Sequence, residues 1–317
     1  MTKIDIYSGF LGAGKTTLIK KMIAEGYCGQ KLVLIENEFG EIGIDGGFLQ
    51  EAGINITEMN SGCICCSLVG DFGKALERVI TEYHPDRVII EPSGVGKLSD
   101  VIGAVQKVQD VELGYSVAVA DAGKVKVYMK NFGEFYNNQI ETASTIILSR
   151  TDAIAQDKLD KAVAMLREHN ADATVVTTPW NELTGEQLLK AMEGKATVAA
   201  QLEEMEHEHH HHDEHCSCGH DHHHHHADEV FTSWGVETAK KFTLEQIENA
   251  LEALDTDEYG MVLRAKGIVP CVTGGWIHFD FVPCEHNVRM GCADITGKLC
   301  VIGSQLNEAA IAALFGV

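Results

Sequence analysis

The sequence has no apolar run approaching the ~20 residues that a membrane-spanning helix needs. Its N-terminus also lacks the charged region followed by an apolar one that marks an export signal. Basic residues are scarce: 25 Lys and Arg stand against 47 Asp and Glu, which gives a formal net charge of -22. Such an acidic chain is not expected to bind nucleic acid or a membrane, but it suits the handling of cations. We therefore predict a cytoplasmic protein.

A disulfide framework is not expected either. The chain has ten cysteines, and in a sequence without an export signal these are predicted to be free thiols or metal ligands. Its 317 residues leave room for two domains with substantial cores.

A glycine-rich loop begins at Gly9. Residues 9–17 read GFLGAGKTT and fit the Walker A pattern G-x-x-x-x-G-K-[ST], between an apolar strand-like run at 4–7 and a helical pattern at 17–25. Small residues let successive backbone N–H groups curve around a phosphate at a helix N-terminus. The alternative interpretation is a glycine turn that precedes Lys-Thr by chance. Lys15 is predicted to reach the β- and γ-phosphates and Thr16 to offer its hydroxyl to Mg²⁺. The predicted nucleotide-binding residues of this loop are Gly9, Gly12, Ala13, Gly14, Lys15, Thr16 and Thr17.

Acidic residues follow two further apolar runs. The run at 32–35 leads into an acidic, glycine-rich segment at 36–45, whose carboxylates, Glu38 among them, can hold Mg²⁺ through water or join a second metal site. A solvated loop is the equal alternative. The run at 87–90 ends at Glu91, as in a Walker B strand, and Glu91 is predicted to position a catalytic water or a metal ion. The N–H of Gly94 can sense the γ-phosphate; an ordinary strand with a solvated acid is the alternative.

The base is predicted to be read after the apolar run 145–148. The next four residues, Ser149 to Asp152, stand where GTP-binding proteins carry N/T-K-x-D. A carboxylate at Asp152 accepts from both the ring N–H and the amino group of guanine, which adenine cannot match, so GTP is favoured over ATP. Arg150 replaces the lysine, and its stem can still lie over the purine. Ser149 replaces the asparagine and has fewer groups with which to hold the loop or the base.

Three cysteines, Cys63, Cys65 and Cys66, lie just ahead of a predicted helix. Three thiols in four residues repel one another once ionised, so a divalent cation stabilises them, and a helix N-terminus lowers thiolate pKa values. In extended backbone Cys63 and Cys65 face one side and Cys66 the other, so a tetrahedral ion needs further ligands or keeps an open position. Buried, inert cysteines are the alternative.

Five segments together resemble a known family: GFLGAGKTT at 9–17, NEFGE at 37–41, CICC at 63–66, EPSG at 91–94 and SRTD at 149–152. In this order they look like the CobW-type metallochaperone GTPases, relatives of the nickel chaperones HypB and UreG. The resemblance implies a GTPase whose cysteine motif binds a transition metal, zinc or cobalt, with nucleotide state controlling delivery to a client metalloprotein. It covers residues 1 to about 190 and the end of the chain.

A histidine-rich tract at 207–226 is too polar to be buried in a core. It is internal and interrupted by cysteines and acids, so we do not interpret it as a tag. Neutral imidazoles and thiolates suit Zn²⁺, Ni²⁺, Cu²⁺ and Co²⁺ with little selectivity, and a polar spacer is the alternative. The predicted ligands are His207, His209, His210, His211, His212, His215, Cys216, Cys218, His220, His222, His223, His224, His225 and His226.

The remainder of the chain predicts a smaller domain with a strand, a helix, several strands and a last helix. Thr243 to Gln246 read as a capping box, residues 261–269, 276–282 and 298–303 as strands, and 307–315 as a short helix. Cys271, Cys284, Cys292 and Cys300 lack zinc-ribbon spacing, so we expect buried small hydrophobes rather than a second metal site.

The fold class predicted for the whole chain is α/β: a P-loop NTPase domain with a mainly parallel sheet at 1–194, an acidic, histidine-rich and disordered linker at 195–229, and an α+β domain at 230–317. The predicted function is a Mg²⁺-dependent GTPase that delivers a transition metal to a client protein; no particular oligomeric state is predicted. The alternatives are a metal store acting through the histidine tract and an ATPase, GTPase or small-molecule kinase that assists cobalamin or other metallocofactor assembly.

Overall fold

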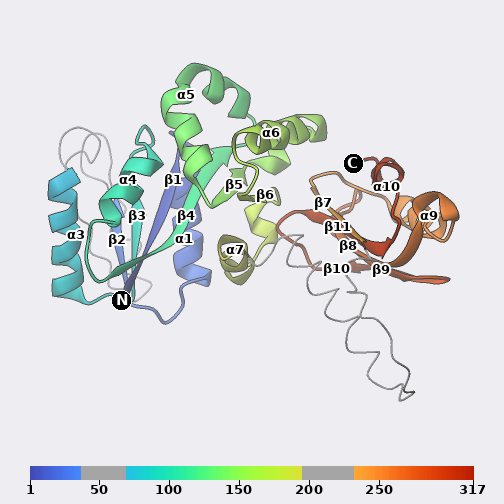
Figure 1. The fold of residues 1–317 in the computed structure, drawn as a ribbon. Helices are drawn as coiled ribbons and strands as arrows, with labels where there is room; N and C mark the ends of the chain where they lie inside the picture. Colours follow the sequence, from blue (N-terminus) through green and yellow to red (C-terminus); the bar gives the residue numbers. More distant parts are fainter. Residues whose placement is uncertain (37–68, 195–231) are drawn as a thin grey trace, which may run out of the picture. The chain divides into compact units, whose positions relative to one another are not determined.

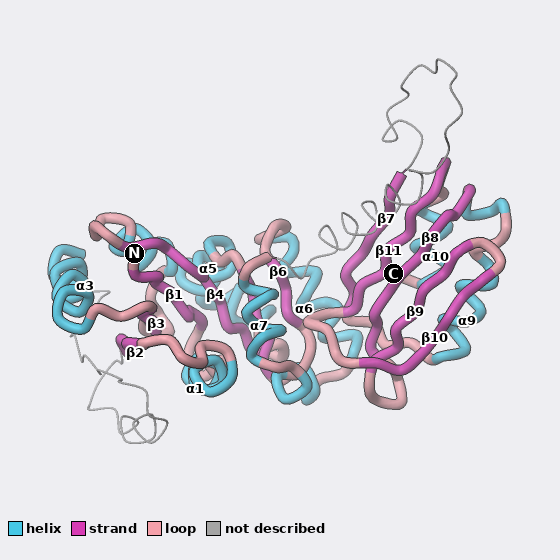
Figure 2. The backbone as a smooth tube through the Cα atoms, turned by 90° about the horizontal axis from the view of Figure 1, so that it is seen from below, coloured by secondary structure: helices cyan, strands magenta, loops and turns pink. Residues whose placement is uncertain are grey.

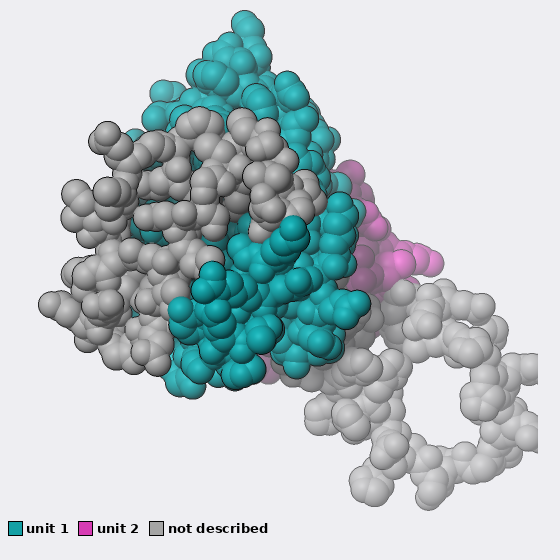
Figure 3. Space-filling model, turned by 90° about the vertical axis from the view of Figure 1, so that its left-hand side faces the viewer, with its two compact units in different colours: residues 1–194 teal, residues 195–317 magenta. Residues whose placement is uncertain are grey.

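The computed structural model describes residues 1–36, 69–194 and 232–317 as parts of two compact units, residues 1–194 and 195–317 (Figure 1, Figure 3). Glu38, the three-cysteine motif and the histidine tract lie outside the described residues. Within the described ranges, no helix is both long and apolar enough to cross a bilayer.

Unit 1 contains a six-stranded sheet with the order β2-β3-β1-β4-β5-β6, in which neighbouring strands are all parallel. Its strands are β1 (Thr2–Gly9), β2 (Leu32–Glu36), β3 (Arg87–Glu91), β4 (Val111–Asp121), β5 (Thr145–Ser149) and β6 (Thr174–Val176). The middle residues of these strands are buried, which explains why they read as continuous apolar runs. The prediction of a mainly parallel sheet is confirmed.

Helices cover both faces of this sheet. They are α1 (Lys15–Glu25), α3 (Val69–Tyr83), α4 (Leu98–Val105), α5 (Val125–Thr142), α6 (Gln156–His169) and α7 (Gly185–Met192). Helices α3 to α6 pack in a row, whereas α1 packs with α7 (Figure 1, Figure 2). The chain runs from β1 outward to β2 and then reverses, passing through β3 to β4, β5 and β6; because parallel crossovers are right-handed, this puts α1 on the face opposite α3 to α6. Ligands of such sheets bind beyond the carboxyl ends of the strands, where neighbouring strands send their connections to opposite faces, which here is between β1 and β3.

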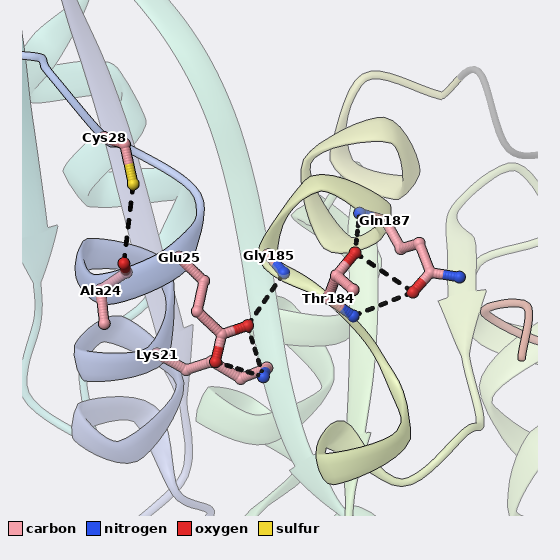
Figure 4. A network of polar contacts seen from close by, with 7 residues as sticks. All are labelled: Lys21, Ala24, Glu25, Cys28, Thr184, Gly185 and Gln187. Carbon is pink, nitrogen blue, oxygen red and sulfur yellow. Dashed lines mark hydrogen bonds and ion pairs between the residues drawn. The ribbon is translucent and has the colours of Figure 1, made fainter.

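The contact between α1 and α7 is close because Gly185 has no side chain. A Cβ on Gly185 would lie 2.6 Å from the carbonyl carbon of Glu25. The Glu25 carboxylate accepts a hydrogen bond of 3.1 Å from the N–H of Gly185 and pairs with Lys21 at 2.7 Å (Figure 4). Thr184 and Gln187 form a capping box at the start of α7. The helix that begins at the glycine loop is thus anchored at its far end.

A buried network joins β1 to its neighbours before the chain reaches the glycine loop. Asp5, which is fully buried, accepts hydrogen bonds from the Tyr27 hydroxyl (2.7 Å), the Arg87 guanidinium and the N–H of Tyr115 (2.9 Å). Burial raises the pKa of Asp5, while the positive charge of Arg87 acts in the opposite direction. Because these buried hydrogen bonds join residues of three strands, the network fixes β1 relative to β3 and β4.

Unit 2 contains a five-stranded sheet with the order β10-β9-β8-β11-β7, in which neighbouring strands are antiparallel. Its elements are β7 (Thr232–Thr238), α9 (Leu244–Ala253), η4 (Asp257–Tyr259), β8 (Met261–Pro270), β9 (Trp276–Val282), β10 (Glu285–Gly291), β11 (Gly297–Ser304) and α10 (Glu308–Phe315). Apolar residues of α9 and α10, such as Leu251 and Phe315, share one core with Phe279 of β9. The predicted capping box is present, since Thr243 accepts from the N–H of Gln246.

The prediction that all four C-terminal cysteines are buried is only half right. Cys271 and Cys300 are buried, and burial raises the pKa of the Cys300 thiol to about 12, which disfavours the thiolate that a metal requires. Cys284 and Cys292 are exposed. Cys284 occupies the turn between β9 and β10 with a φ of 67°, and Cys292 follows the exposed strand β10. Both of these positions lie outside the core that the sequence led us to expect.

Candidate functional site

The glycine loop connects β1 to α1 at the carboxyl edge of the parallel sheet. Gly9, Gly12 and Gly14 have φ values of 146°, 69° and 102°, a region that residues with a Cβ rarely adopt. At Gly9 the neighbouring strand also leaves no space, since a Cβ would lie 2.3 Å from the carbonyl oxygen of Val119. The loop therefore folds tightly, and the N–H groups of the first turn of α1 lie at this edge.

Lys15, Thr16 and Glu91 meet beside this loop. The Lys15 ammonium donates to the carbonyl oxygen of Gly9 at 3.0 Å and lies 4.0 Å from a carboxylate oxygen of Glu91. The Thr16 hydroxyl lies 3.0 and 3.1 Å from the two oxygens of the same carboxylate. The structure thus brings the loop lysine, the hydroxyl and the strand-end acid together. Hydroxyl and carboxylate oxygens are the donors that Mg²⁺ prefers, so these residues fit the ion.

The segment after β3 lies against the glycine loop. A Cβ on Gly94 would be 2.9 Å from the backbone nitrogen of Leu11, so only glycine allows this approach. Gln139, a buried residue of α5, donates its amide N–H to the carbonyl oxygens of Gly94 (3.1 Å) and Gly96 (2.8 Å). The sequence reasoning identified Gly94 but missed Gln139, because only the folded chain brings α5 to this turn.

Aromatic residues of α5 hold the first part of the loop. The ring centroid of Phe10 lies 4.6 Å from that of Tyr128, 5.0 Å from that of Phe132 and 6.0 Å from that of Tyr136. Burial raises the pKa of Tyr136, and the nearby charge of Asp121 acts in the same direction, so this phenol stays neutral. Phe10, the second residue of the loop, is therefore anchored in the domain core.

The loop after β5 contains the predicted base-reading residues. Arg150 has a φ of 57°, and its guanidinium donates to the carboxylate of Asp121 and, at 3.1 Å, to the carbonyl oxygen of Gly12. The Ser149 side chain is buried, and its hydroxyl lies 3.4 Å from the carbonyl oxygen of Ala120. Arg150 thus reaches the glycine loop, whereas Ser149 contacts only the neighbouring strand.

Asp152 lies in the short helix η1 (Thr151–Ala153), and its side chain is exposed. An exposed carboxylate at this place has room to accept hydrogen bonds from a nucleotide base. Trp180, in η2 (Trp180–Glu182), donates its indole N–H to the carbonyl oxygen of Leu148 at 3.0 Å. Its ring edge lies 3.1 Å from the point that a Cβ on Gly14 would occupy. The sequence reasoning missed Trp180, and no motif signal marks it.

Thr16 and Glu91, which were predicted to hold Mg²⁺ or its water, are described, whereas the other predicted metal ligands lie outside the described ranges. Within those ranges, no group of three or more His, Cys, Asp or Glu residues is arranged to hold a metal ion. Glu36, the last residue of β2, stands beside Glu91 in the strand register, so β2 ends next to the strand that carries Glu91.

Comparison with known proteins agrees with this geometry. Residues 3–177 match the CobW/HypB/UreG nucleotide-binding domain, and residues 231–316 match the C-terminal domain of the cobalamin synthesis protein cobW. The zinc chaperone YeiR of Escherichia coli K12 is 26% identical over 191 residues, which cover 59% of this chain and 58% of YeiR. The zinc chaperone YjiA of the same organism is 30% identical over 190 residues, which cover 57% of this chain and 58% of YjiA.

The zinc chaperone CobW of a Sinorhizobium species is 30% identical over 180 residues, which cover 47% of this chain and 51% of that protein. The chain therefore spans about half the length of each of these relatives. The nucleotide-binding match covers more than half of this chain, and the glycine loop, Glu91 and the loop after β5 all fall within it. The chain belongs to the CobW/HypB/UreG family.

Proposed function

We propose that the protein is a Mg²⁺-dependent GTPase that carries a transition metal ion, with zinc favoured over cobalt, and delivers it to a client metalloprotein. The observation that carries the hydrolysis of a nucleoside triphosphate is the meeting of Lys15, Thr16 and Glu91 at the end of β1. The names of the relatives as zinc chaperones support the cargo. The corresponding domain limits are 1–194 for the GTPase domain, 195–229 for the linker and 230–317 for the C-terminal domain.

The residues of the site divide the work between phosphates, metal and base. The N–H groups of the loop and the Lys15 ammonium hold the phosphates, while Thr16 and Glu91 supply oxygens for Mg²⁺ or for the water around it. Mg²⁺, when bound, neutralises charge on the β- and γ-phosphate oxygens. The Asp152 carboxylate accepts hydrogen bonds from the ring N–H and the amino group of guanine. Neither an arginine finger nor a catalytic glutamine identifies itself in the sequence, so we expect slow turnover until a client or the cargo metal completes the site.

The cargo is assigned to the thiols of Cys63, Cys65 and Cys66. Thiolates are soft ligands that suit zinc, and a site with an open position can load and release its ion. The histidine tract at 207–226 is assigned to gathering metal nearby, with many exchangeable sites. Imidazole in water takes up a proton near pH ~6.5, so the tract should release metal on mild acidification.

Metal titration with and without nucleotide tests the coupling between the two sites. Zn²⁺, Co²⁺ and Ni²⁺ are titrated into the full chain and into a chain without residues 207–226, each with and without a GTP analogue and Mg²⁺. We expect the nucleotide to tighten one stoichiometric site, and replacement of the three cysteines by serine to remove it. Equal affinity with and without nucleotide would instead favour a metal store that acts through the tract.

A separate nucleotide-competition assay tests the choice of base. Equal competition by GTP and ATP for the nucleotide site would favour an ATPase or a small-molecule kinase.

A further inference from the structure

The loop that reads the base must be held against the loop that binds the phosphates, because the two ends of a nucleotide are a fixed distance apart. Ser149 does not supply this connection. Its hydroxyl contacts the carbonyl oxygen of Ala120 on the adjacent strand, and the side chain is only 6% exposed. The departure from asparagine at this position therefore leaves a tether to be found elsewhere.

Trp180 makes one such tether. Its indole N–H donates at 3.0 Å to the carbonyl oxygen of Leu148, directly before Ser149. The other end of the ring reaches the glycine loop, with two ring carbons 3.1 and 3.5 Å from the Cβ position of Gly14. Gly14 caps α1, and its φ of 102° sets the direction in which the helix leaves the loop. One rigid side chain thus spans both loops.

Arg150 makes the second tether between the two loops. Its guanidinium contacts the carbonyl oxygen of Gly12 at 3.1 Å, and the same group pairs with the carboxylate of Asp121. Asp121 is itself fixed, because its side chain is buried and its second oxygen accepts from the N–H of Gly123 at 3.0 Å. Arginine can make both contacts because its planar fork presents several donors, whereas a lysine has a single nitrogen.

We propose that Trp180 and Arg150 are positioning residues that together hold the base-reading loop on the phosphate loop, and so place the Asp152 carboxylate at the amino group of the purine. The proposal rests on the proposed guanine-nucleotide function. It assigns guanine selectivity in this chain to two residues that do not themselves need to touch the base. Loss of either tether lets Asp152 move while the phosphate contacts remain.

The test compares GDP with IDP. The base of IDP lacks the amino group from which the Asp152 carboxylate accepts a hydrogen bond. Dissociation constants of both are measured by calorimetry with the full chain and Mg²⁺. We expect the wild-type chain to prefer GDP by about tenfold or more, because a hydrogen bond to a carboxylate is lost with IDP. Trp180→Phe keeps an aromatic side chain but removes both the indole N–H and the far ring carbons that approach Gly14, and should reduce this preference by roughly three- to tenfold, through weaker GDP binding. Arg150→Gln should act in the same direction.

Trp234→Phe is the matched control, since Trp234 packs on Phe315 in unit 2, and it should leave the preference unchanged. Equal losses of GDP and IDP affinity in the Trp180 and Arg150 variants would overturn the proposal, because a general loosening of the site weakens both ligands alike. An unchanged preference in both variants would overturn it as well. A wild-type chain that binds GDP and IDP equally would instead overturn the guanine assignment of Asp152, and the tether proposal with it.

Discussion

The phosphate side and the base side of the nucleotide site are built in different ways. On the phosphate side, the loop from Gly9 to Thr16 is continuous in sequence, and among the described residues Glu91 and Gly94 join it from one short segment at the end of β3. On the base side, the loop at 149–152 is held by Trp180, from a segment after the next strand, and by a contact to Gly12, more than a hundred residues earlier. A continuous motif thus contains its own chemistry, whereas a short loop depends on distant residues to position it.

The largest effect is expected on the phosphate side, from Lys15→Met. The variant removes the ammonium that lies against Gly9 and Glu91 and that is predicted to neutralise charge as the phosphoryl group is transferred. We expect GTP turnover to fall by about 100-fold or more, the usual cost of removing one such electrostatic contact. Phosphate release under single-turnover conditions measures it. Lys158→Met, which removes an exposed lysine of α6, is the control, and an equal loss in both variants would rule out a specific role for Lys15.

On the base side, Asp152→Asn should change which purine binds rather than how tightly phosphates are held. The asparagine amide N–H can donate a hydrogen bond to the 2-oxo group of xanthine. Opposite the 2-amino group of guanine, the same N–H faces another donor, so no hydrogen bond forms there. We expect GDP affinity to fall and XDP affinity to rise, for a combined change of roughly 10- to 100-fold in their ratio. Competition of the two diphosphates against a fluorescent nucleotide measures the ratio. Parallel losses of both ligands would mean that Asp152 does not contact the base.

The same contrast explains how much could be predicted from the sequence. The sheet and the loop from Gly9 to Thr16 were predictable because apolar runs and glycine spacing are local patterns. Strand β10 was missed because its side chains are mostly exposed and charged or polar, as suits the edge of a sheet. Trp180 and Gln139 carry no local pattern. Their roles come from contacts with Leu148 and Gly94 that only the folded chain creates.

Gln139→Leu tests whether the phosphate side also has a distant support. The variant has a similar volume but leaves the carbonyl oxygens of Gly94 and Gly96 without their buried donor, which should cost about 1 to 3 kcal/mol in the free energy of unfolding. If Gly94 senses the γ-phosphate, the preference for a GTP analogue over GDP should fall by about fivefold. Calorimetric binding and urea unfolding measure the two quantities.

Gln106→Leu, at an exposed position after α4, is the control for Gln139→Leu. A stability loss without any change in the preference for the triphosphate would make Gln139 a purely structural residue.

The smallest effect is expected from Ser149→Asn, which restores the N-x-x-D spacing. In the wild-type chain the loop is already held by Trp180 and Arg150, so the preference for GDP over IDP should change by less than about twofold, since no new contact with the base is gained. In a Trp180→Phe background the same substitution should recover part of the lost preference, because the two side chains then act as alternatives and their effects are not additive. Double-mutant cycles from the four dissociation-constant ratios measure this coupling. Strict additivity would mean that the asparagine position and the indole do not hold the same loop, and that the base side depends on Arg150 alone.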